Sequence, residues 1–193
     1  MALLRSIRPR PLRLGILHRF GLDARGVSAL EFALIAPVMI LIYFGVGELC
    51  EAMMAQRRTS HATSAIGDLT TQSQSVASSD VSDIFAAATT IMAPFPTAPL
   101  KLRMTSVTAN SSGTPKVDWS CAQGGLTKYT TGATFTGLPT GLVSAAGDSI
   151  IVSEGQYNWA SPAKYVLPNG LNFNEIFYLK PRKSAQVTGP ASC

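Results

Sequence analysis

The feature that most constrains this chain is an apolar run from Val27 to Gly47 that contains a single charged residue, Glu31. A helix of that length, at about 1.5 Å per residue, spans the roughly 30 Å hydrocarbon core of a bilayer. A charged side chain in hydrocarbon costs a few kcal/mol or more, so an isolated acid there usually marks a functional site. The sequence therefore predicts a transmembrane segment over 27–47 and makes Glu31 a candidate site residue.

The positive charge of the chain lies before this run. The formal net charge is +5, from 16 basic and 11 acidic residues. Residues 1–26 carry that whole excess, because they contain one acidic residue, Asp23, and the six arginines Arg5, Arg8, Arg10, Arg13, Arg19 and Arg25. A nucleic-acid-binding protein would carry basic residues on its folded domain, so no nucleic acid is expected as a partner. The positive-inside rule predicts a cytoplasmic basic leader, 1–26, with the rest of the chain outside.

Two features of the apolar run leave alternatives open. A cleaved secretory signal is disfavoured because the run is too long and no small-x-small site follows it. A simple uncleaved signal anchor remains possible on these residues alone.

Pro37, in the middle of the run, removes a helix hydrogen bond and should bend or loosen the helix. Either a harmless kink or a role in helix packing or in extraction of the helix would explain it.

A helical region is predicted over 48–98. Apolar residues continue at three- and four-residue steps, which predicts one long helix from Val27 to about Leu69. A polar run from Thr70 to Ser79 interrupts it. Ser79 or Asp80 can then cap a second helix that continues to about Met92, before Pro94 and Pro96.

A β-rich region is predicted over 99–193. Residues 100–108 and 116–121 form a hairpin around the turn at 110–115, and 149–159 form a third strand. Segments 173–179 and 184–187 could add a fourth and a fifth strand, and the glycine-rich stretch 124–147 is expected to be a long exposed loop. The outer domain, residues 48–193, is therefore expected to be α+β, with a helix covering one face of an antiparallel sheet.

Three cysteines suggest one disulfide. Cys121 ends a predicted strand and Cys193 is the last residue. In an oxidising compartment these two form the natural pair. The bond would close a loop of about 70 residues and raise the free energy of unfolding by on the order of 3–4 kcal/mol. Cys50, near the membrane surface, is expected to be a buried small apolar residue, with an intermolecular bridge as the alternative.

The sequence contains no arrangement of residues typical of catalysis. After the leader there is one histidine, His61, which we expect to be solvated. We find no Cys-x-x-Cys, no paired histidines, no acidic cluster with metal spacing and no glycine-rich phosphate loop. We therefore expect no catalytic residues, no metal, no cofactor and no small-molecule substrate.

The start of the apolar run resembles a known family. Its residues are similar to the start of TadE-like proteins, minor pseudopilins of the bacterial tight-adherence (Tad) pilus and secretion machinery: Gly26-Val27-Ser28-Ala29-Leu30-Glu31-Phe32-Ala33-Leu34-Ile35-Ala36-Pro37. The family begins with a glycine, small or apolar residues, Glu-Phe, an apolar run and a proline. The stretch 178–182 is similar to the family's C-terminal Pro-Arg segment. The related TadF and TadG proteins share the start.

This resemblance implies a function without an enzyme activity. It implies a pilin-like fold and cleavage after Gly26 by a prepilin peptidase of the inner membrane, which would expose a new ammonium on Val27. Glu31 would then pair with the terminal amine of a neighbouring subunit, with Phe32 and Pro37 in the same assembly helix. The implied partners are the inner membrane and other subunits of a type IVb pilus, with the outer domain in the periplasm. The alternative is a signal-anchored periplasmic binding or adhesion module that is not processed.

Overall fold

A computed structural model describes residues 26–193 of the chain. The arginines of the predicted leader lie outside the described residues. The chain divides into two compact units, the first ending at Tyr43 and the second comprising Phe44–Cys193. Each unit is described by itself below.

The first element is a long helix, α2, which runs from Val27 to Thr71 (45 residues). The predicted helix through about Leu69 is therefore confirmed. It continues through Pro37, whose missing N–H leaves the carbonyl of Ala33 without its usual intrahelical donor. Its N-terminal stretch is long and apolar enough to cross a membrane, and none of that stretch is buried within the protein.

The second helix, α3, spans Ser78–Ile91. Its N-cap residue is Ala77, so the predicted cap at Ser79 or Asp80 is wrong by two or three positions. A carboxylate at the third helical position fixes the start instead, because Asp80 Oδ2 accepts a hydrogen bond from the backbone N–H of Ala77 at 2.9 Å.

Four strands form one antiparallel sheet in the order β2-β1-β3-β4. Their bounds are Leu100–Ala109 for β1, Pro115–Gln123 for β2, Ser149–Trp159 for β3 and Leu171–Leu179 for β4. The α+β class predicted from sequence is confirmed. The fifth strand at 184–187 is wrong: within residues 26–193 this segment makes no strand, and its neighbour Thr188 makes only an isolated parallel bridge to Ser75.

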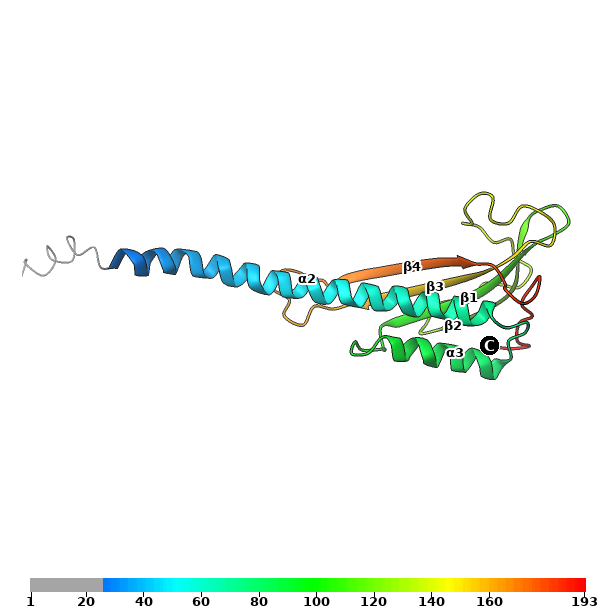
Figure 1. The fold of residues 1–193 in the computed structure, drawn as a ribbon, viewed down its shortest axis with the longest axis horizontal. Helices are drawn as coiled ribbons and strands as arrows, with labels where there is room; N and C mark the ends of the chain where they lie inside the picture. The colour runs from blue at the N-terminus through cyan, green and yellow to red at the C-terminus, as the bar shows by residue number, and fades with distance from the viewer. Residues whose placement is uncertain (1–25) are drawn as a thin grey trace, which may run out of the picture. The chain divides into compact units, whose positions relative to one another are not determined.

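One face of the sheet packs against both helices. Figure 1 shows the C-terminal part of α2 beside α3 against the strands. Ile66 of α2, Phe85 of α3 and Met104 of β1 belong to the same buried cluster. Gly155 of β3 allows a close approach, because a methyl group built there would overlap the hydroxyl of Thr63. This face is the main core of the domain.

The glycine-rich stretch 124–147 packs on the opposite face of the sheet. Phe135 is buried there against Val107, Val117, Ile150 and Val152. The prediction of an exposed loop is therefore wrong at Phe135, although most of the stretch is exposed. The glycines supply the turns, and the few apolar residues between them supply a second, smaller core.

Candidate functional site

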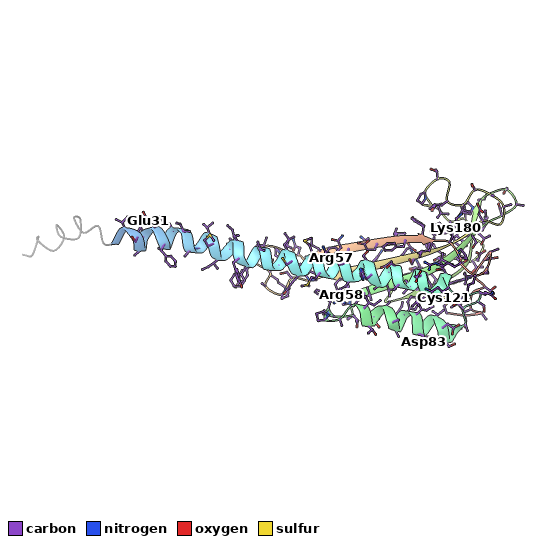
Figure 2. All side chains as sticks on the ribbon, in the orientation of Figure 1. Glu31, Arg57, Arg58, Asp83, Cys121 and Lys180 are labelled. Atoms are coloured by element: carbon purple, nitrogen blue, oxygen red, sulfur yellow. A yellow bond between two sulfur atoms is a disulfide. The ribbon has the colours of Figure 1, made fainter. Side chains whose placement is uncertain are left out.

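The N-terminal end of α2 holds the site predicted from sequence. Gly26 directly precedes the helix, and a Cβ built on it would meet no atom within 4 Å. Val27 is the first helical residue and Glu31 follows it by four, so the two lie on one face of the helix. Glu31 is exposed and has no hydrogen-bond or ion-pair partner within residues 26–193; Figure 2 labels it in the first turns of α2.

The residues that follow Glu31 form an apolar helix surface. Phe32 is 72% exposed, and Pro37 is exposed as well. Many of the large apolar side chains of α2 between positions 27 and 46 are similarly uncovered by the protein. Such a surface can face lipid or the apolar helices of other chains, and in either setting an unpaired carboxylate needs a cationic or hydrogen-bonding partner.

Glu48 forms a second site, which sequence reasoning missed. It is the first residue after the predicted membrane segment and is 4% exposed. Its Oε1 accepts a hydrogen bond from the backbone N–H of Tyr165 at 2.8 Å, and Oε2 accepts two more, from Val166 at 3.1 Å and Leu167 at 2.9 Å. Burial raises the pKa of the Glu48 carboxyl, but these donors lower it more, so the pKa lies below its ordinary value.

A third polar cluster ties the glycine-rich stretch to the sheet. Arg103 and Glu154 are cross-strand partners on β1 and β3, joined by Nε–Oε2 at 2.6 Å and Nη2–Oε1 at 2.7 Å. Nη2 of Arg103 also donates to the hydroxyl of Tyr129 at 2.8 Å, and the guanidinium carbon lies 3.9 Å from the centre of the Tyr129 ring. The two parallel hydrogen bonds to Glu154 and the aromatic ring beside the guanidinium satisfy Arg103 within the protein, so we assign this cluster a structural role and not a ligand site.

The structure joins Cys121 of β2 to Cys193 by a disulfide, with their α-carbons 5.4 Å apart. Cys50 is a free, exposed thiol on α2, so its predicted burial is wrong. The helix turns that position away from the sheet. His61 is exposed as predicted, and no group of three metal-ligating side chains occurs within the described part of the chain.

The Pro-Arg segment after β4 meets the C-terminal end of α2. The backbone N–H of Arg182 donates to the carbonyl of Thr71 at 3.0 Å, and the Arg182 guanidinium pairs with Asp68. The last carbonyls of a helix have no partner within it, so this donor satisfies one of them. A cation beside the negative end of the helix dipole is favourable as well.

Comparison with protein families assigns the N-terminal part of the chain. The model of the TadE-like protein family matches residues 26–67, which include Glu31, Phe32 and Pro37. No match was found among curated proteins or among solved structures. The resemblance drawn from residues 26–37 is thus confirmed: residues 26–67 of this chain are similar to the TadE-like protein family.

Proposed function

We propose that this chain is a non-enzymatic minor pseudopilin of a Tad-type (type IVb) pilus or secretion system. A prepilin peptidase cuts it between Gly26 and Val27, and it assembles through its N-terminal helix. The observation that carries the proposal is Glu31, exposed and unpaired within the described residues, one turn after Val27 on an apolar helix that matches the TadE-like family.

The chemistry of the site explains why processing and assembly belong together. Cleavage removes the arginine-rich leader and leaves an ammonium on Val27 beside the carboxylate of Glu31. Each charge alone is costly in hydrocarbon, whereas a carboxylate paired with the ammonium of a neighbouring subunit is tolerated. Glu31 therefore favours a partner helix over lipid. Phe32 and Pro37 belong to the helix surface that such a partner covers.

The proposed topology follows from the same residues. Residues 1–26 form a cytoplasmic leader, 27–47 cross the bacterial inner membrane once, and 48–193 lie in the periplasm. Within the outer domain, residues 48–98 form the helical part and 99–193 the β-rich part. The partners are the membrane, the peptidase and other pilus subunits.

Substitutions at Glu31 test the assembly role. Glu31→Leu removes the charge and should leave a protein that is membrane-bound and processed but does not support piliation, counted by electron microscopy of whole cells. Glu31→Asp keeps the charge and should retain piliation. Glu51→Leu makes the same chemical change at an exposed position further along α2 and is the matched control. Normal piliation with Glu31→Leu would refute the intersubunit pairing.

A further inference from the structure

The loop between β3 and β4, residues 160–170, contacts the end of the predicted membrane segment. The ring of Tyr165 packs on the ring of Phe44, with centroids 5.5 Å apart. A Cβ built on Gly45 would lie 3.1 Å from Cγ2 of Val166, so Val166 lies directly over that glycine. Phe44 and Gly45 are among the last residues of the segment 27–47. The tip of the loop is therefore level with residues that the proposed span places at the membrane surface.

Glu48 holds the loop in this position. Its buried carboxylate accepts backbone hydrogen bonds from three consecutive residues, 165–167. Three charge-assisted bonds to one side chain fix the path of the backbone more firmly than the packing of a short loop would. The loop tip is thus attached to the helix one residue beyond the predicted end of the span.

The side chains on this fixed tip remain uncovered. Tyr165 is 73% exposed and Val166 is 44% exposed. Leu49 and Met53, on the neighbouring turns of α2, are also exposed apolar residues. Phe44 and Gly45, which the loop contacts, are themselves among the last residues of the proposed span, so the medium that surrounds these two residues also reaches the loop. Tyrosine is typical of membrane–water interfaces, where its ring is in apolar surroundings and its hydroxyl in water.

We propose that Tyr165 and Val166 insert into the interfacial region of the lipid leaflet from which the outer domain emerges, giving that domain a second contact with the bilayer. This inference rests on the proposed membrane span. Lys164 is exposed beside Tyr165, and its side chain is long enough for the ammonium to reach lipid phosphates when the loop inserts. Glu48 acts as a positioning residue, because it touches the loop backbone and not the lipid.

The test places nitroxide labels on the full-length protein in phosphatidylcholine vesicles. In a Cys50→Ser background, single labels are attached through Val166→Cys, through Tyr165→Cys, through Ile40→Cys within the span and through Ser111→Cys in the β1–β2 turn. Relaxation by oxygen, which concentrates in lipid, is compared with relaxation by a water-soluble nickel chelate. The labels at 40, 165 and 166 should be relaxed more strongly by oxygen than by the nickel chelate, and the label at 111 more strongly by the nickel chelate. Glu48→Gln should raise the nickel accessibility at 166 severalfold while leaving position 40 unchanged.

The label at position 40 separates this inference from the proposed function. A lipid-like result at 40 with water-like results at both 165 and 166 would overturn the loop insertion and leave the membrane span intact. A water-like result at 40 would overturn the span, and with it both proposals.

Discussion

Reduction of the Cys121–Cys193 disulfide should lower the free energy of unfolding of the outer domain by about 4 kcal/mol. The magnitude follows from the sequence separation of 72 residues, because the loop-closure entropy that a bond removes from the unfolded chain grows with the length of the loop. That amount is a large part of the stability of a small domain, which is typically about 5–15 kcal/mol.

The native position of the C-terminal tail does not depend on this bond alone. Val187 is fully buried, and its carbonyl accepts a hydrogen bond from Nε1 of Trp119 at 2.9 Å. The backbone of Thr188 donates to Gln74 and accepts from Val76. The reduced protein should therefore keep its native fold without denaturant, and the effect of reduction should appear in the unfolding transition.

Urea unfolding of the full-length protein in detergent, followed by tryptophan fluorescence, measures this effect. Both tryptophans, Trp119 and Trp159, are buried in the outer domain and report its unfolding. The variant with Cys121→Ala and Cys193→Ala should lose about 1 kcal/mol more than the reduced wild type, because it also loses a buried sulfur atom. Cys50→Ser is the control and should behave as wild type. Equal midpoints with and without reductant, in protein shown by non-reducing mass mapping to be oxidised beforehand, would refute the reasoning.

Three further predictions concern the contacts that hold the domain together. Gly155→Ala should cost about 1–3 kcal/mol in the same urea assay, because the new methyl overlaps Thr63; an unchanged midpoint would contradict the close packing. Glu154→Gln should lower the free energy of unfolding by about 1–3 kcal/mol, because the Arg103 guanidinium loses its ionised acceptor. Glu154→Asp keeps the charge and should lower it less. Equal losses for the two variants would show that the charge of residue 154 does not stabilise the domain. The pKa of Glu48 is lowered in the folded protein, so the stabilisation by its carboxylate is complete above the ordinary glutamate pKa and is lost as pH falls through the lowered value. The difference in the free energy of unfolding between wild type and Glu48→Gln should therefore shrink on acidification. A difference that grows would contradict the loop attachment.

The elements that sequence predicts well here are those with a local pattern. The apolar run and its continuation predict α2 to within a few residues, and β-branched stretches predict β3 with its observed bounds, Ser149–Trp159. Each depends on residues that are close in the sequence. The TadE-like start is also local, and its residues suffice to predict the family match.

The features that sequence missed depend on distant partners. Glu48 binds backbone groups 117 to 119 residues away, and nothing around Glu48 indicates where its acceptor atoms find donors. The segment 184–187 is fixed without a strand partner, because Val187 is buried and its carbonyl accepts a hydrogen bond from the Trp119 side chain, which is distant in the sequence. Phe135 lies in a glycine-rich stretch whose composition predicts an exposed loop, so the local sequence does not indicate that Phe135 is buried in the second core.

The most direct test of the central claim is the N-terminal residue of the mature protein. Protein extracted from the membranes of cells with an intact prepilin peptidase should begin at Val27. Gly26→Leu should block cleavage and leave a species about 26 residues longer. The reason is that glycine has no side chain, which lets the backbone at the cleavage site leave helical geometry. Removal of the peptidase gene should give the same longer species from the wild-type sequence. A wild-type protein that keeps Met1 or Ala2 in cells with the peptidase would contradict the pseudopilin assignment and favour an unprocessed signal-anchored module.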